Sequence, residues 1–300
     1  MRPMFQGSIV ALVTPFSGGK VDEAKLRQLV EMHVAQGTDG IVPCGTTGES
    51  PTLSHDEHRR VVEIVIEAAR GRLHVIAGTG SNATSEAIDL TRHAKKAGAD
   101  AVLHSTGYYN KPTQDGLYRH FKAISEAVDI PIFVYNVPVR TIVDIQVATL
   151  ARCAKLEHVV GVKDATANVA RVTQQRLACG KNFIQLSGED GTVLGFMAHG
   201  GMGCISVTSN VAPRLCADFQ NACLKGNWKA ALELQDRLMP LHDVLFVETN
   251  PAPVKYAAWR LGIINSPECR LPLAPLTDAT KKAIDDVLAR VGLLQAKAAE

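Results

Sequence analysis

The sequence has no uncharged apolar run that approaches the roughly 18 residues of a membrane helix. The apolar stretch 9–13 is too short for a signal peptide and is interrupted soon afterwards by Pro15. An excess of charge is also missing, because 32 basic residues face 30 acidic ones and the net charge is +2. This balance gives no electrostatic reason to expect nucleic-acid or membrane binding. The sequence therefore predicts a cytoplasmic protein that binds neither.

The cysteines contain no pair at the two-residue spacing that is typical of zinc and redox sites. Their number is odd, and they are scattered along the chain at Cys44, Cys153, Cys179, Cys204, Cys216, Cys223 and Cys269. Free, buried thiols in a reducing compartment are the simplest interpretation. No metal site is predicted.

Glycine-rich phosphate-binding turns are also missing. Residues 14–20, after the first apolar run, lack the three-glycine spacing of a dinucleotide-binding crossover. The glycine-containing segment 45–50 lacks the Gly-Lys-Thr ending of a nucleotide-binding loop. These absences argue against an open, doubly wound sheet.

What the chain does have is a regular alternation of short apolar runs and longer amphipathic segments, with a period of about thirty residues. The predicted strands are residues 9–13, 41–43, 73–77, 101–103, 131–135, 159–163, 183–186 and 204–207. The predicted helices between and after them are residues 23–36, 56–70, 85–96, 114–128, 145–154, 169–178, 191–199 and 213–224. Eight such pairs predict an α/β protein with a (β/α)8 TIM barrel.

The chain after residue 225 contains helical patterns without further strands, at residues 228–247, 252–261 and 278–291. We therefore expect a catalytic barrel domain at residues 1–225 and an all-helical C-terminal extension at residues 226–300. We expect this extension to pack on the barrel rather than to fold independently.

Barrel enzymes place their chemistry at the C-terminal ends of the strands, so polar residues at these positions are candidates for the active site. Lys163 follows the apolar run 159–162. Partial desolvation there would favour the neutral amine, which attacks carbonyl carbons to form a Schiff base. The alternative is a lysine that extends its ammonium group into solvent.

Three further strand ends carry polar residues. The glycines around Thr46 and Thr47 allow a turn whose N–H groups converge on a carboxylate, although the threonines could equally satisfy local backbone groups. Tyr135 can exchange protons, and Arg140 offers a planar fork for a second carboxylate; the alternative is a core aromatic followed by a surface arginine. The adjacent tyrosines of the 106–112 segment are candidates as well, or an ordinary packing pair.

Taken together, these motifs resemble the pyruvate-dependent class I aldolases, and most closely the dihydrodipicolinate synthase family. The resemblance covers nearly the whole chain. It rests on residues 45–50, 108–112, 135–138, 161–166, 186–190 and 246–255. It implies a lyase that joins pyruvate to L-aspartate 4-semialdehyde, in the first committed step of diaminopimelate and lysine biosynthesis. It implies a covalent Schiff base on Lys163 and no metal or other cofactor.

The resemblance also assigns roles to individual residues. Tyr135, Thr46 and Tyr109 would form a proton relay, with Tyr109 reaching in from a neighbouring subunit of a homo-oligomer, a dimer of dimers. Thr46 and Thr47 would hold the pyruvate carboxylate, and Arg140 would hold that of the semialdehyde. Two residues would line the pocket with backbone groups, namely Gly188 and Ile205.

A second site is implied for free L-lysine, which would act as an allosteric inhibitor. Its residues would be Ser50, His55, His58, Asn82, Glu86 and Tyr108. His55 and His58 are three residues apart in one helical turn and so share a face. Glu86 could pair with an ammonium group, and Tyr108 adjoins the relay residue Tyr109. The alternative is a helix start with two solvated histidines.

The sequence departs from the family pattern at four positions, namely Pro51, Gly107, Val139 and Ile142. The last two add bulk near the expected aldehyde pocket. Two rival functions therefore stay open. One is an aldolase that acts on a different aldehyde or a sugar acid, and the other is a barrel protein that binds a keto acid without turning it over.

Overall fold

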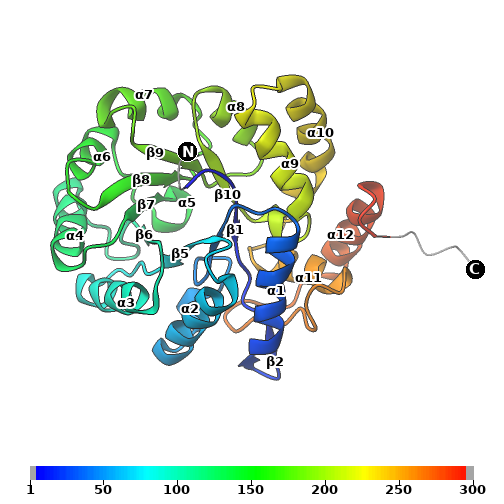
Figure 1. Ribbon diagram of the computed structural model, residues 1–300. Helices are drawn as coiled ribbons and strands as arrows, with labels where there is room; N and C mark the ends of the chain where they lie inside the picture. Colours follow the sequence, from blue (N-terminus) through cyan, green and yellow to red (C-terminus); the bar gives the residue numbers. More distant parts are fainter. Residues whose placement is uncertain (1–4, 295–300) are drawn as a thin grey trace, which may run out of the picture.

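The computed structural model describes residues 5–294. Its centre is a closed barrel of parallel strands in the order β1-β10-β9-β8-β7-β6-β5-β4, surrounded by helices (Figure 1). The barrel strands are β1 (Gly7–Ala11), β4 (Gly40–Val42), β5 (His74–Gly78), β6 (Ala101–Ser105), β7 (Ile132–Asn136), β8 (Val159–Asp164), β9 (Ile184–Ser187) and β10 (Gly203–Ser206). The predicted (β/α)8 barrel is confirmed, and each predicted strand overlaps an observed one.

The helices also follow the predicted alternation. Those that accompany the barrel are α1 (Glu23–Ala35), α2 (His55–Ala69), α3 (Thr84–Ala97), α4 (Gln114–Ala127), α5 (Pro138–Thr141), α6 (Val147–Cys153), α7 (Ala170–Cys179), α8 (Val193–Ala198) and α9 (Pro213–Leu224). Ser54 and Glu57 form the capping box that starts α2. Gly98 ends α3 with φ at +99°, a conformation that an L side chain disfavours.

Two local elements were not predicted. Strands β2 (Phe16–Ser17) and β3 (Lys20–Val21) form a small hairpin beside the barrel. The segment after β7 contains a separate helical turn, α5, and the predicted helix 145–154 begins only at Val147. Pro138 starts α5 because its fixed φ suits the first helical position. Ile142 ends α5 with φ at +63°. Arg140 therefore lies on a short helical turn of its own, separate from α6.

The interior of the barrel is filled by side chains rather than open. Apolar residues from alternate strand positions meet there, and the cluster includes Ile9, Val42, Ile76, Leu103, Phe133, Tyr135, Leu186 and Ile205. Phe5 lies edge-on against Phe133, with 5.2 Å between the ring centroids. Because the barrel is filled, a substrate can only bind at its ends.

The C-terminal helices α10 (Trp228–Val244), α11 (Ala252–Arg260) and α12 (Asp278–Arg290) gather at one side of the barrel (Figure 1). This part of the chain is helical, as expected. The boundary at residue 225 stays a prediction. Among residues 5–294, no helix combines the length and the apolar composition needed to cross a membrane.

Candidate active site

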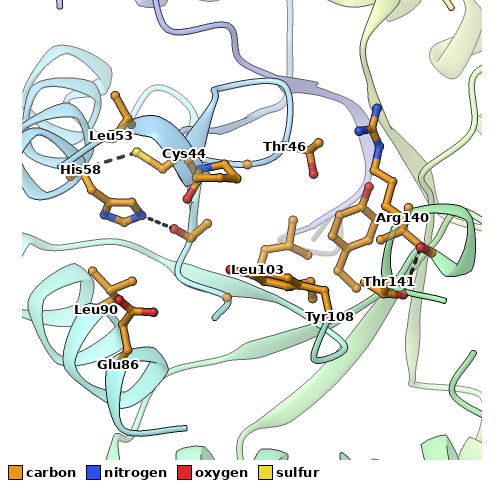
Figure 2. A pocket seen from close by; sticks show the side chains of 18 of the residues that line it. Cys44, Thr46, Leu53, His58, Glu86, Leu90, Leu103, Tyr108, Arg140 and Thr141 are labelled. Atoms are coloured by element: carbon orange, nitrogen blue, oxygen red, sulfur yellow. Dashed lines mark hydrogen bonds between the residues drawn. The ribbon is translucent and has the colours of Figure 1, made fainter. Parts of the chain in front are cut away.

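A cavity of about 360 Å³ opens at the C-terminal ends of strands β4 to β7. Figure 2 shows Thr46 and Arg140 on one side of it and His58 and Glu86 on the other, with Tyr108 between them. The predicted residues that line this one cavity are Thr46, Tyr135, Arg140, Ser50, His55, His58, Glu86 and Tyr108. The two predicted sites are therefore neighbouring parts of one hollow.

Lys163 and Tyr135 form a register pair on the adjacent strands β8 and β7. The Lys163 Nζ atom lies 4.2 Å from the centre of the Tyr135 ring. The two residues are only 6% and 8% exposed. No carboxylate within residues 5–294 forms an ion pair with Lys163, so its nitrogen is available to a carbonyl carbon. This is the geometry expected of a Schiff-base lysine with an acid–base group beside it.

Gly188 allows the Lys163 side chain to take this path. A Cβ atom at position 188 would lie 2.9 Å from Lys163 Cε and 2.8 Å from Ala165 Cβ. Such distances are too short for carbon atoms, so any side chain would displace the lysine. Ile205 is buried in the barrel interior, in the same apolar cluster as Tyr135. Both predicted lining residues thus lie close to the Lys163–Tyr135 pair.

The segment after β4 forms the predicted tight turn. The backbone N–H groups of Gly48 and Ser50 donate to the Gly45 carbonyl at 3.1 and 3.3 Å. A Cβ at Gly48 would lie only 3.0 Å from the carbonyl oxygen of Leu12, which explains the glycine. The turn therefore packs tightly against β1 and holds the two threonines in place.

Asn250, which was not predicted as a site residue, connects the two predicted carboxylate-binding residues, Thr47 and Arg140. Its side-chain Nδ2 atom donates to Thr47 Oγ1 at 3.1 Å, and its backbone carbonyl accepts from Arg140 Nη2 at 3.4 Å. Thr47 accepts this bond and so keeps its own hydroxyl hydrogen for another acceptor. A segment of the C-terminal extension thus orients both Thr47 and Arg140.

The second half of the cavity holds a polar cluster between α2 and α3. His55 Nε2 lies 2.7 Å from Glu86 Oε1, and the Ser81 hydroxyl donates to the other carboxylate oxygen. The hydrogen bonds from Ser81 and then His55 lower the pKa of the Glu86 carboxyl, so this group is a carboxylate at neutral pH.

His58 is not solvated, in contrast to the alternative in which both histidines would lie in solvent at the start of a helix. It is buried, and its Nε2 atom donates to the Gly78 carbonyl at 2.8 Å. Burial lowers its pKa to about 4, so the ring is neutral at pH 7. Its neighbour His55 is exposed.

Six of the predicted residues do not line this cavity, namely Thr47, Lys163, Gly188 and Ile205, described above, and Tyr109 and Asn82. Tyr109 is 95% exposed, with its backbone in the left-handed region at φ +67°. Asn82 contributes its backbone carbonyl, which accepts from Asn110 Nδ2 at 2.9 Å. Of the three residues of the predicted relay, Tyr135 and Thr46 line the cavity of the described chain and Tyr109 does not.

Comparison with known proteins shows the family. The model of the dihydrodipicolinate synthetase family matches residues 4–291. The chain belongs to the dihydrodipicolinate synthetase family. A relative from Parvibaculum lavamentivorans, named 4-hydroxy-tetrahydrodipicolinate synthase, is 63% identical over 97% of this chain and 100% of its own.

Solved members of the dihydrodipicolinate synthetase family share the fold. The enzyme from Acinetobacter baumannii, solved in complex with pyruvate, is 45% identical and matches with a TM-score of 0.94, over 96% of this chain and 99% of its own. The enzyme from Cyanidioschyzon merolae, solved with lysine bound, is 35% identical with a TM-score of 0.93, over 97% of this chain and 99% of its own.

The structure also contains a buried ion pair that the sequence analysis did not predict. Lys255 Nζ, on α11, lies 2.7 Å from Glu49 Oε1, and the two side chains are 0% and 1% exposed. The second Glu49 oxygen accepts from the Arg270 backbone N–H at 2.9 Å. Glu49 belongs to the same turn, since its backbone N–H donates to the Thr46 carbonyl at 3.1 Å, so the ion pair connects this turn to α11. The partners are 206 residues apart, and no local pattern relates them.

Proposed function

We propose that the chain catalyses the condensation of pyruvate with L-aspartate 4-semialdehyde to 4-hydroxy-tetrahydrodipicolinate through a Schiff base on Lys163. It is a lyase of lysine biosynthesis, as the names of its relatives indicate. The single observation that carries the residue assignment is the buried Lys163 amine, 4.2 Å from the Tyr135 ring at the ends of two adjacent strands.

The reaction begins at the Lys163 amine. The amine attacks the carbonyl carbon of pyruvate, and water leaves to give a protonated imine. The imine draws electrons, so the methyl group loses a proton and an enamine forms. The enamine carbon then attacks the aldehyde carbon, and the aldehyde oxygen takes up a proton. Finally the amino group of the semialdehyde attacks the imine carbon, which closes the ring and releases Lys163. No metal or redox cofactor enters these steps.

Tyr135 and Thr46 pass protons within the chain, and Tyr109 of the partner subunit completes this relay. The exposure of Tyr109 in its own chain supports this assignment. It requires a homo-oligomer, at least a dimer and in our proposal a dimer of dimers.

Substrate binding divides along the cavity. Thr46 and Thr47 hold the pyruvate carboxylate, and Gly188 and Ile205 shape the pocket near the reacting carbon. Arg140 pairs with the carboxylate of the semialdehyde. Asn250 supports this division because it touches both Thr47 and Arg140.

L-lysine acts as an inhibitor at the far end of the same cavity in this proposal. Ser50, His55, His58, Glu86 and Tyr108 line that end, and Asn82 lies beside it. Glu86 pairs with an ammonium group, because its carboxylate is ionised and partly exposed. A lysine-bound relative supports a role for this ligand class.

Borohydride reduction tests the function directly. The protein is treated with pyruvate and sodium borohydride, and the intact mass and the modified peptide are determined. We expect one pyruvate adduct per chain, on Lys163. Turnover is then compared between aspartate semialdehyde and other aldehydes. No adduct contradicts the proposed chemistry, and an adduct with turnover of another aldehyde alone favours the first rival function.

A further inference from the structure

The residues that follow the two reacting side chains are themselves a register pair. Asn136 follows Tyr135 on β7, and Asp164 follows Lys163 on β8. Side chains alternate along a strand, so these two point outward to the helical layer while Tyr135 and Lys163 face the site. Asn136 is fully buried, and Asp164 is 4% exposed. Buried polar groups at this position require partners.

Asp164 has a full set of partners. Its carboxylate accepts from Arg171 Nε at 3.1 Å, Gln175 Nε2 at 2.6 Å and Thr166 Oγ1 at 2.6 Å. Arg171 and Gln175 both belong to α7, so the strand end that carries Lys163 is fixed to the following helix.

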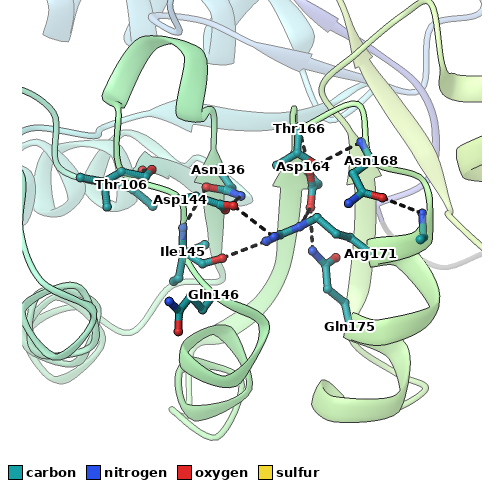
Figure 3. Close-up of polar contacts among 12 residues, drawn as sticks. Thr106, Asn136, Asp144, Ile145, Gln146, Asp164, Thr166, Asn168, Arg171 and Gln175 are labelled. Atoms are coloured by element: carbon teal, nitrogen blue, oxygen red, sulfur yellow. Dashed lines mark hydrogen bonds and ion pairs between the residues drawn. The ribbon is translucent and has the colours of Figure 1, made fainter.

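Arg171 reaches the other strand end as well. Its Nη2 atom donates to the Ile145 carbonyl at 2.8 Å, and Nη1 lies 3.3 Å from Asp144 Oδ2. Asn136 holds the same segment, because it donates to Asp144 Oδ1 at 2.8 Å and accepts from the Ile145 N–H at 3.2 Å. Figure 3 shows the Arg171 side chain between Asp164 on one side and Asp144 and Ile145 on the other.

We propose that Arg171 is a positioning residue for the reaction, which rests on the proposed function. Its planar fork joins the strand end of Lys163 to the segment 144–145, which in turn holds the strand end of Tyr135. That segment also closes the loop that begins at α5 and carries Arg140. One buried guanidinium thus supports from outside the two paired strand ends that carry the nucleophile and its acid–base neighbour, together with the segment that follows the aldehyde anchor.

The test uses two variants and a matched control. Arg171→Lys keeps the charge but loses the planar fork. Asp144→Asn removes one partner at a side chain that is 48% exposed, so this variant should fold even if the first does not. The control is Arg152→Lys on α6, where an exposed arginine pairs with Asp115 at 3.0 Å away from the site.

The fraction of active sites is first determined from the pyruvate adduct formed with borohydride, and kcat is divided by this fraction. The KM values for pyruvate and for the semialdehyde and the melting temperature are measured as well. We expect Arg171→Lys to lower kcat per titrated site about tenfold or more, because small displacements of reacting groups have such effects. Asp144→Asn should show a smaller loss, and Arg152→Lys none.

The possible outcomes distinguish a failure of the proposed role of Arg171 from a failure of the proposed function. A lower melting temperature with unchanged kcat per titrated site in both variants would make Arg171 merely structural and overturn the proposal. Wild-type protein that forms no pyruvate adduct would overturn the proposed function and this inference with it. If Arg171→Lys does not fold, Asp144→Asn decides alone.

Discussion

The pyruvate side and the aldehyde side of the cavity are built in different ways. Lys163 and Tyr135 lie on barrel strands, are nearly inaccessible and are fixed by strand register. Arg140 lies on the short helix α5 after β7, and Tyr109 lies on the loop after β6, where it is exposed and does not line the cavity of its own chain. In the proposed mechanism, the covalent chemistry therefore uses side chains of the barrel strands, whereas the second substrate would meet residues that follow those strands.

The largest effect should come from the pyruvate side. Lys163→Arg keeps the charge but replaces the amine by a guanidinium group, which stays protonated and cannot form the imine. We expect complete loss of the pyruvate adduct, measured by intact mass after borohydride, with an unchanged circular dichroism spectrum. An adduct in this variant would place the Schiff base on another residue.

Tyr109 tests whether catalysis at one site depends on a residue of the partner subunit. Tyr109→Phe removes the hydroxyl group and should lower kcat about 10² to 10⁴-fold, as expected for a lost proton-transfer group. Mixing this variant with Lys163→Ala under subunit exchange should restore part of the activity, because one site of each heterodimer has both residues. Verified heterodimers without activity would place Tyr109 in its own chain's site or outside catalysis.

Glu49 tests how much the buried ion pair at the turn after β4 contributes to stability. Glu49→Ala leaves Lys255 buried without its carboxylate, which should lower the free energy of unfolding by about 3–5 kcal/mol. Glu67→Ala is the control, since its pair with Arg27 is exposed and should contribute about 0–1 kcal/mol. Denaturant unfolding measures both, and equal changes would mean that burial gives the Glu49 pair no special weight.

The pyruvate side is also the part that could be predicted from the sequence. The apolar run 159–162 determines a buried strand, and the position of Lys163 at its end follows from the barrel rule alone. Tyr135 could be found in the same way. The capping box of Ser54 and Glu57 is likewise local, because both partners lie within the first turn of α2.

The contacts that hold the site together could not be predicted. Glu49 meets Lys255, and Thr47 meets Asn250, across more than two hundred residues of sequence. Arg171 contacts both the end of strand β8 and the loop between α5 and α6. Such pairs are decided by how the extension and the helices pack on the barrel, and no spacing rule describes that packing. The proposed role of Tyr109 also involves a second chain, about which a pattern in one sequence says little.

Arg140 gives a smaller, selective effect that separates the two sides. Arg140→Ala removes a charge-assisted contact to a carboxylate, which costs about 1.5–3 kcal/mol, or roughly ten- to a hundredfold in kcat/KM for the semialdehyde. The KM for pyruvate should change much less. If the pyruvate KM rises most, the two carboxylates have been assigned to the wrong anchors.

The smallest effect is expected at the far end of the cavity, where Glu86 accepts from Ser81 and His55. Glu86→Ala should weaken inhibition by L-lysine, because the ammonium group loses its carboxylate partner. A ligand at that end lies in the same cavity as Tyr135 and Thr46, so it can act on the relay if it binds the less active arrangement better. Steady-state rates at millimolar lysine measure this in the wild type and the variant, with Glu67→Ala as a surface control. Wild-type rates that do not respond to lysine would remove the inhibitor from the proposal, and inhibition unchanged in the variant would move its site elsewhere.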